Sequence, residues 1–439
     1  MADFLKDFYQ TIEEGALEPG DPRYVHLYED SELCQSDPVE RLFATIDWGA
    51  SQTAQLFSGF RGTGKSTELR RLKKKLEAAG YVVLLCDMKL YLNLSMPVDV
   101  GDFLLAVAGA VGDALSNPLL LGKKPELGYW DRALNFLTRT QIDLNELGLN
   151  AKIPGTDLGA SLKASIRQDP VFLEKLQARM RGHLSSFAAE VHSFLEECAL
   201  ALREARGIDT RIVVLFDSVE QYHGGSRSAE EVFASLETLF AGHAEKLKLP
   251  YLHVVYTIPP WLQVRVPNVG ERYQAKVTVP AIRLYNKDGT ICRSGRTVMQ
   301  GLVEKRGNWR KLIRDEASFQ KVLEASGGHI RDLFRILREL LILGRNRSLP
   351  LTNIGKEDAV TLAIDLVRRH FLPISIQDAR WLCRVADSHD ISLPDGQQLV
   401  GLARLFDQQL ILCYANGEEW YNTHPLVLAH VRQIATSTV

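Results

Sequence analysis

The sequence contains few cysteines and places none of them in a pair motif. Six cysteines are spread over 439 residues, and no two stand in a C-x-x-C arrangement. This pattern argues against a zinc site and is typical of reduced thiols in a cytoplasmic protein. The eleven histidines show no metal-ligand spacing either. His424, followed by Pro425, has no nucleophile beside it, so we interpret it as structural rather than catalytic.

Long apolar runs are missing as well. No stretch approaches the ~18 uninterrupted apolar residues that a membrane helix requires, so we expect no membrane span. The first residues, Met1 to Asp7, are acidic and lack the pattern of a signal peptide. A net charge of −2, with 46% hydrophobic and 24% charged residues, is typical of an ordinary globular protein. We therefore expect a cytoplasmic protein of two or three domains whose overall charge favours neither nucleic acid nor membrane as a partner.

What the sequence does contain is a glycine-rich stretch, LFSGFRGTGKST, at residues 56–67. Residues 59–66 fit the pattern G-x-x-x-x-G-K-S of a phosphate-binding loop. An apolar run at 54–58 precedes the loop, and leucines at helical spacing follow it. A glycine-rich turn with a solvated lysine is the alternative, but it does not account for the strand before the loop and the helix after it. The sequence therefore predicts a phosphate-binding P-loop.

Each residue type of this loop has a role in holding phosphate. The glycines let the backbone curl so that its N–H groups point at phosphate oxygens. The helix that starts near Ser66 adds its positive N-terminal end. Lys65 can reach the β- and γ-phosphates, and the Ser66 hydroxyl can hold Mg²⁺. The residues expected at the nucleotide are Gly59, Arg61, Gly62, Thr63, Gly64, Lys65, Ser66 and Thr67.

A second nucleotide signal is the strand-like run from Arg211 to Asp217. Its five apolar residues end in Asp217, and a carboxylate at the C-terminal edge of a parallel sheet lies where ligands collect. We expect Asp217 to hold Mg²⁺ through water. Glu220, three residues on, is our candidate for orienting or deprotonating the attacking water. The alternative is that Glu220 caps the next segment.

A further strand is predicted for the apolar, β-branched run at residues 251–257. Thr257 stands at its C-terminal end, where a hydroxyl can sense the γ-phosphate or satisfy local backbone groups. A last strand is expected at 276–284. Between the two strands, Arg265 or Arg272 can act as an arginine finger toward a neighbouring subunit, although surface arginines are common.

Helical regions precede and interrupt this core. Residues 1–45 contain an amphipathic segment and a helix start at Asp37-Pro38, and we expect this part either beside the adenine or in ordinary packing contacts. Residues 116–208 are expected to form a mainly helical insertion. Within it, apolar residues at spacings of three and four from Leu173 to Leu202 predict one long amphipathic helix that packs internally.

The chain from about residue 295 to residue 343 is helical and basic. Between Glu304 and Arg347, eleven Lys/Arg face six Asp/Glu, a local charge of +5. Gly327-Gly328 is expected to end one helix and begin the next, with Arg331 in the first turn. A guanidinium there can reach the γ-phosphate and couple this lid to the nucleotide state. The alternative is an ordinary ion pair, for example with Asp332.

Three helical patterns and a hairpin make up the C-terminal part. The helices are expected near residues 357–370, 376–387 and 397–408, and Asn416-Gly417 is a strong hairpin signal. Three helices followed by a hairpin is the order of a winged helix, a fold that often reads DNA with a basic helix. Residues 351–439, however, hold seven Lys/Arg against ten Asp/Glu, a balance of −3. We therefore favour protein contact over DNA contact, because neutralising phosphates requires several cations.

These motifs, in this order, resemble those of the AAA+/STAND branch of P-loop ATPases, and the arrangement is similar to that of origin-recognition-type and STAND signalling ATPases. The resemblance covers about residues 37–345, and the C-terminal domain by its arrangement. Two positions depart from the family. Ser218 stands directly after the metal aspartate, where the family often has an acidic base, and Thr257 stands where the first sensor is often Asn. Both departures put the rate of hydrolysis in question more than nucleotide binding.

The resemblance implies ATP and Mg²⁺ as cofactors and a role for each matched residue. It implies a switch that controls assembly with itself or with a partner effector, as in bacterial defence systems. A DNA-binding loader or transposition helper is the alternative, and a nucleotide-binding scaffold without turnover is a third possibility. The implied roles are phosphate and metal binding for Lys65 and Ser66, metal binding for Asp217, water activation for Glu220, first sensor for Thr257 and second sensor for Arg331.

The expected fold class is α/β, with a parallel-sheet P-loop core, a helical insertion, a helical lid and a C-terminal winged helix. The expected domains are an N-terminal segment (1–45), the P-loop ATPase core (46–288, with the insertion at about 116–208), the lid (289–347) and the winged-helix-like domain (348–439).

Overall fold

A computed structural model describes residues 2–13, 15–30, 33, 36–116, 120, 129–139, 158–223, 229–351, 358–392 and 399–436. The chain forms two compact units. We call the first the sheet unit, which comprises Leu42–Ser58 and Leu72–Val277. We call the second the lid unit, which comprises Met1–Arg41, Gly59–Arg71 and Thr278–Val439.

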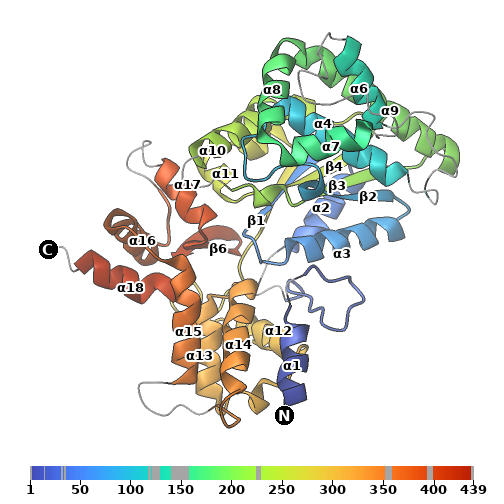
Figure 1. The fold of residues 1–439 in the computed structure, drawn as a ribbon. Coiled ribbons are helices and arrows are strands. Elements are labelled where there is room, and N and C mark those ends of the chain that lie inside the picture. Colours follow the sequence, from blue (N-terminus) through green and yellow to red (C-terminus); the bar gives the residue numbers. More distant parts are fainter. Residues whose placement is uncertain are drawn as a thin grey trace. The chain divides into compact units, whose positions relative to one another are not determined.

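The core of the sheet unit consists of the strands β1 (Thr53–Gly59), β2 (Val82–Asp87), β3 (Ile212–Asp217), β4 (His253–Ile258) and β5 (Ala275–Val279). Their order in the sheet is β2-β3-β4-β1-β5 (Figure 1). β1 pairs with β4, β4 with β3, and β3 with β2, all in parallel. The middle strands are almost wholly buried because their residues are apolar and β-branched. The predicted α/β fold with a parallel sheet is confirmed.

The last strand is shorter than the sequence pattern predicted. We expected it to run over 276–284, but β5 ends at Val279. Pro280 follows directly, and proline has no N–H to donate to a sheet ladder. The prediction of a strand up to Leu284 was therefore wrong: the apolar residues after Pro280 are buried in the lid unit without continuing the sheet.

The helices of the sheet unit are α2 (Pro38–Asp47), α3 (Lys65–Ala78), α4 (Val100–Leu115), α6 (Tyr129–Arg139), α7 (Leu158–Gln168), α8 (Pro170–Met180), α9 (Leu184–Arg206), α10 (Ala229–Glu237) and α11 (Trp261–Arg265). The first turns of α2 and α3 belong to the lid unit. A capping box between Asp99 and Asp102 starts α4. α4 packs against β2 on one side and α9 on another, so it joins the sheet to the inserted helices.

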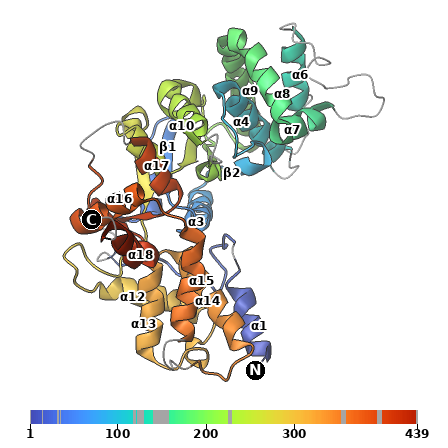
Figure 2. The same ribbon diagram turned by 60° about the vertical axis from the view of Figure 1, so that its left-hand side comes forward.

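The insertion forms a group of helices around α4, with α6, α7, α8 and α9 side by side (Figure 2). The predicted single long helix is two helices, because the short 3-10 turn Arg181–His183 separates α8 from α9. Gly182 lies in this turn, and glycine weakens a helix interior. The predicted internal packing is confirmed, because the apolar positions of α9, among them Val191 and Leu195, are buried.

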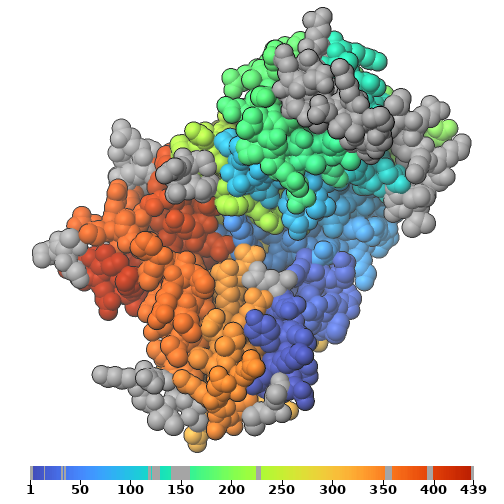
Figure 3. Space-filling view, viewed as in Figure 1, coloured from blue at the N-terminus to red at the C-terminus, as the bar shows by residue number. Residues whose placement is uncertain are grey.

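The lid unit contains α1 (Ala2–Thr11), α12 (Arg293–Glu304), α13 (Glu316–Ser326), α14 (Ile330–Gly344), α15 (Ala359–Arg368), α16 (Ile376–Ser388), α17 (Leu399–Asp407), the hairpin of β6 (Ile411–Asn416) and β7 (Glu418–Thr423), and α18 (Pro425–Thr436). The N-terminal helix lies against the lid helices, blue against orange in Figure 3. The Thr11 hydroxyl donates to the carbonyl of Arg306 at 2.7 Å, and the Phe8 ring fills the space over Gly307.

Gly327 and Gly328 separate α13 from α14, as the sequence predicted. Gly327 has a φ of 59° and closes α13, and Arg331 lies in the first turn of α14. In the C-terminal part, the expected hairpin is confirmed, and Gly417, with a φ of 86°, forms its tip. The predicted helix starts at 357 and 397 lie outside the described residues. Helix α18 was not predicted from the sequence, although Pro425 suits a first helical position.

Within the described ranges, none of the helices combines the length and the apolar character needed to span a membrane.

Candidate functional site

The glycine-rich loop connects the end of β1 to the start of α3. Gly62 and Gly64 have φ values of 90° and 96°, which other residue types rarely adopt. Gly62 has a second constraint, because a Cβ atom there would overlap the side chain of Arg331. The Thr63 hydroxyl closes the turn by donating to the carbonyl of Phe60 at 2.9 Å. The predicted order of strand, loop and helix is confirmed.

Lys65, the first residue of α3, has a buried side chain that is 3% exposed. Its ammonium group donates to the carbonyl oxygens of Gly59 at 2.8 Å and Phe60 at 2.6 Å. The positive charge is thus held inside the curl of the loop, where phosphate oxygens are stronger acceptors than carbonyls. Ser66 follows, half-buried, in the first turn of α3, at the positive end of the helix dipole.

The N-terminal part of the lid unit borders the first turns of α3. The N–H of Leu17 donates to the hydroxyl of Thr67 at 3.0 Å. Arg71 binds Asp37 with two hydrogen bonds, of 2.7 and 2.5 Å. Burial raises the pKa of Asp37, but the hydrogen bonds from Arg71 outweigh this and lower it. The segment is therefore fixed beside the loop, and its expected place beside an adenine stays a prediction.

The start of α14 contacts the tip of the loop. The N–H of Arg331 donates to the carbonyl of Gly62 at 3.3 Å. Nε2 of His329 donates to the carbonyl of Arg61 at 2.8 Å. The backbone of the predicted second sensor is therefore bonded to the P-loop itself.

Asp332, fully buried, connects this contact to the C-terminal part. One of its oxygens lies 2.5 Å from Nδ1 of His329 and 3.1 Å from Nε2 of His424, and the other accepts from Arg335 at 3.0 Å. Burial acts to raise the pKa of Asp332, but the charge of His329 and the hydrogen bonds hold it well below its usual range. Burial lowers the pKa of His424. Asp332 thus forms its ion pair with Arg335 and hydrogen bonds with both histidines.

These buried groups form a hydrogen-bond network rather than a metal centre. Nδ1 of His424 accepts the N–H of Leu426 at 3.2 Å, so the ring hydrogen lies on Nε2, which donates to Asp332. A metal ion would need the lone pair of that Nε2. His424 therefore has a structural role, in agreement with the sequence interpretation.

Residues at the end of α17 contact the same loop. Arg61 forms an ion pair with Asp407 at 3.2 Å, and Nε2 of Gln409 donates to the Arg61 carbonyl at 2.9 Å. The rings of Phe60 and Phe406 are stacked, with centroids 5.7 Å apart. The sequence did not predict these contacts, because no local pattern connects positions nearly 350 residues apart.

The end of β3 is shaped by a tight turn. Ser218 has a φ of 72°, and the N–H after it, of Val219, donates to the Thr257 hydroxyl at 3.0 Å. That hydroxyl in turn donates to the carbonyl of Phe216 at 3.1 Å. Thr257 is fully buried. Its hydroxyl therefore satisfies local backbone groups, one of the two roles that the sequence left open.

Asp217 and Glu220 lie on either side of this turn. Asp217 ends β3 at the edge of the sheet where the parallel strands β1 and β4 also end. Glu220 lies in the short 3-10 helix Val219–Gln221 and is 5% exposed. The turn thus presents two carboxylates at the carboxyl edge of the sheet, the edge where α/β folds bind ligands. Their metal and water roles stay predictions.

Arg265 is held within the sheet unit. Its guanidinium forms ion pairs with Glu230, at 2.7 Å, and with Glu237, and its side chain is 10% exposed. Reaching a neighbouring subunit would break both pairs. The finger role of Arg265 or Arg272 stays a prediction.

The fold and the loop define a class: an α/β protein with a parallel sheet and a P-loop. No family model and no curated protein matches the chain. Among solved structures, it is similar to the Walker-type ATPase paby2304 of Pyrococcus abyssi, with 14% identity over 94% of this chain and 100% of the other and a TM-score of 0.40. It is also similar to the ORC2 protein of Aeropyrum pernix, solved as ADPNP-ADP complexes, with 12% identity over 98% of each chain and a TM-score of 0.44.

A third similar structure is Cdc6p from Pyrobaculum aerophilum, with 11% identity over 98% of each chain and a TM-score of 0.36. At such identities and TM-scores the likeness assigns no function to this chain.

Proposed function

We propose that this protein is a molecular switch that binds and hydrolyses Mg²⁺-ATP. The loop of residues 59–66, with the Lys65 ammonium inside its curl, supports this proposal. Lys65, Ser66 and the backbone N–H groups of the loop would hold the phosphates, with Ser66 and Asp217 as metal ligands. A bound Mg²⁺ would neutralise charge on the phosphates. The residues of this chain would orient the nucleotide and the attacking water.

One observation supports the role as a switch: the tip of the loop is hydrogen-bonded to two separate elements of the lid unit. The Arg61 carbonyl accepts from both His329 and Gln409, and the Arg61 side chain pairs with Asp407. Each such hydrogen bond is worth about 1 kcal/mol, so together they reach the 1–3 kcal/mol or so that is typical of coupling between sites. A loop that rearranges around phosphate would therefore shift the position of α14 and α17. The output would be assembly with a second copy or with a partner effector.

Arg331 is the residue we expect to report the nucleotide state to the lid. Arg331→Ala should leave ATP affinity within about threefold of wild type, because Lys65 and the loop backbone remain. It should abolish any ATP-dependent change in mass measured by light scattering. Arg345→Ala, at the exposed end of the same helix, is the matched control and should behave as wild type. Normal ATP-dependent assembly of the Arg331→Ala variant would show that Arg331 does not sense the nucleotide state.

The proposed function is tested by trapping the ATP state with Glu220→Gln. This variant should bind ATP normally and lose hydrolysis at least about 100-fold, as expected for removing a group that positions or deprotonates water. Light scattering with Mg²⁺-ATP should then show a stable assembly of defined mass. Glu245→Gln, exposed on the same unit, is the control and should turn over ATP as wild type. Unchanged turnover in Glu220→Gln would show that Glu220 is not the catalytic base.

The alternative of a DNA-binding ATPase has less support. Cations of the C-terminal part are paired with carboxylates of the same part: Arg404 with Asp378 at 2.6 Å, Arg368 with Asp365 at 2.9 Å, and Arg432 with Asp387 at 3.3 Å. Binding DNA phosphates would require breaking these pairs. DNA binding that weakens steeply with salt would favour the alternative.

A further inference from the structure

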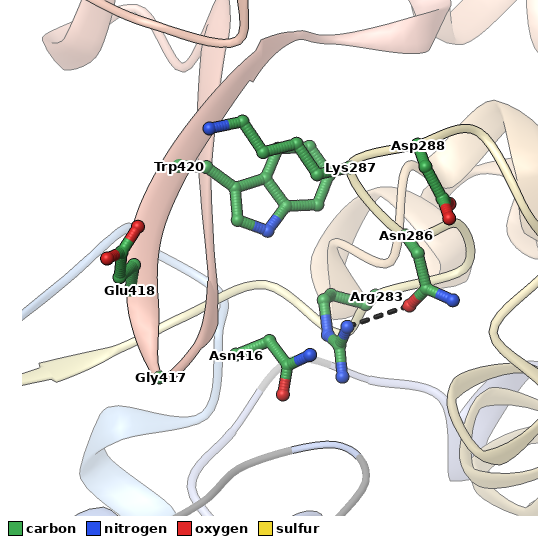
Figure 4. A pocket seen from close by; sticks show the side chains of 8 residues that line it. All are labelled: Arg283, Asn286, Lys287, Asp288, Asn416, Gly417, Glu418 and Trp420. Atoms are coloured by element: carbon green, nitrogen blue, oxygen red, sulfur yellow. Dashed lines mark hydrogen bonds between the residues drawn. The ribbon is translucent and has the colours of Figure 1, made fainter.

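A cavity of about 670 Å³ opens between two hairpin tips of the lid unit (Figure 4). One tip is the turn of β6 and β7 at residues 416–418. The other is the turn after Leu284, where Tyr285 bridges Ile291 and the N–H of Asn286 donates to the carbonyl of Thr290 at 2.8 Å. Cavities of this volume fit small-molecule ligands. The cavity shares no residue with the P-loop, so it is a separate site.

A buried arginine and a tryptophan form the inner part of the cavity. Arg283 is 2% exposed, and its guanidinium donates to the amide oxygen of Asn286 at 2.8 Å. Trp420 is 6% exposed and stacks on Tyr414, with ring centroids 4.6 Å apart. In Figure 4 the side chains of Arg283 and Asn416 lie below the indole ring. A guanidinium offers five N–H groups in a planar fork that matches carboxylate and phosphate oxygens.

The charges at the rim are mixed. Lys287 is exposed and lines the cavity (Figure 4). Asp288 is turned into its own loop, where one carboxylate oxygen accepts from the N–H and the hydroxyl of Thr290 at 2.9 and 2.6 Å. Glu418 is exposed at the hairpin tip, and the two carboxylates lie at opposite margins of the view. Both carboxylates line the cavity together with Arg283, Lys287, two amides and the indole ring, but that of Asp288 is already engaged by Thr290.

We propose that this cavity binds a small organic anion that combines a planar ring with a phosphate or carboxylate group. Arg283 and Lys287 would bind the anionic group, and the indole of Trp420 would contact the ring. The amides of Asn286 and Asn416 would bind polar atoms at the ring edge. A nucleoside monophosphate and an aromatic acid share this chemistry and are the two sources to distinguish.

Hydrogen bonds connect the lining of the cavity to the glycine pair before α14. The N–H of Ile282, next to Arg283, donates to the carbonyl of Gly328 at 3.1 Å, and the hydroxyl of Tyr414 donates to the carbonyl of Gly327 at 2.6 Å. This glycine pair sets the start of α14, where Arg331 bonds to the loop. A ligand held between the two hairpin tips would therefore restrain the turn that positions Arg331. This regulatory effect rests on the proposed ATPase, whereas ligand binding does not.

The test is calorimetric titration of the full chain with adenosine monophosphate, 4-hydroxybenzoate and inorganic phosphate. Each probe is titrated into wild type and into Lys65→Ala, in which the P-loop no longer competes for anions. We expect a ring-bearing probe to bind both proteins with similar affinity and inorganic phosphate to bind at least about tenfold more weakly. Lys287→Glu should lower the affinity at least about tenfold, because it replaces attraction with repulsion. Lys321→Glu, which reverses the charge of an exposed residue on α13, is the matched control and should not change the affinity.

Each outcome decides the proposal. Binding of adenosine monophosphate alone identifies a phosphate ligand, and binding of 4-hydroxybenzoate alone identifies a carboxylate ligand. Arg283→Lys, which keeps the positive charge but loses the planar fork of N–H groups, should also weaken binding. No heat from any probe, loss of binding in Lys65→Ala, or affinity unchanged by both cavity variants would overturn the proposal. If a ligand binds but leaves the ATPase rate unchanged, the regulatory part is wrong and the site remains.

Discussion

Replacing Lys65 with alanine is expected to lower ATP affinity at least about 100-fold, or about 3 kcal/mol, because charge-assisted contacts to phosphate are lost. The ammonium is buried within the loop and is fixed by the carbonyls of Gly59 and Phe60. Arg61, the other cation of the loop, is paired with Asp407. Fluorescent-nucleotide titration measures the affinity, and phosphate release measures turnover, which should fall to background.

A matched control separates this effect from a loss of helix α3. Lys74 is exposed on the same helix, so Lys74→Ala changes charge and helix propensity in the same way without touching the loop. It should bind ATP as wild type does. Circular dichroism should show both variants folded. Wild-type ATP binding by a folded Lys65→Ala protein would contradict the P-loop assignment and the proposed function with it.

The second large effect is expected from Gly328→Ala, which should destabilise the protein by about 3 kcal/mol or more. The residue has a φ of 74°, where an alanine costs about 1–2 kcal/mol. In addition, a Cβ atom there would overlap the carbonyl oxygen of Ile282, whose own N–H is bonded to Gly328. A backbone atom cannot move aside as a side chain can. The midpoint of urea-induced unfolding measures the loss.

Gly289→Ala isolates the steric part of that effect. Gly289 has a φ of 82°, close to that of Gly328, but a Cβ atom there meets nothing within 4 Å. Its substitution should cost only about 1–2 kcal/mol, the conformational penalty alone. The difference between the two variants measures the contact with Ile282. Equal losses would show that the chain around residue 282 yields without cost, and Arg331 would then not be held in place by this turn.

The elements that the sequence predicted well are those with strong local signals. The strand before the loop, the helix after it and the Asp217 strand follow from apolar runs and from glycines at positions whose backbone conformation other residues rarely adopt. The break before Arg331 follows from Gly327-Gly328, because two glycines in sequence end a helix. In each case the physical cause lies within a few residues of the predicted feature.

The two incorrect predictions concern places where the apolar pattern continues through a residue that interrupts a helix or a strand. Apolar spacing continues through Gly182, but the backbone tightens there and splits α8 from α9. The apolar run continues beyond Pro280, but a proline cannot extend a sheet ladder, so β5 ends. Periodicity reports which residues are buried. It does not report which partner buries them.

The sequence by itself determined the P-loop, the order of the strands along the chain and the positions of the candidate catalytic residues, because these depend on short-range backbone preferences and on residue type. Only the tertiary structure decided which residues meet at the loop tip. His329, Asp407 and Gln409 reach Arg61 from helices far away in sequence, and such contacts depend on how whole elements pack rather than on any local pattern. The same holds for the cavity at Arg283 and Trp420, which exists because two separate hairpin tips face each other.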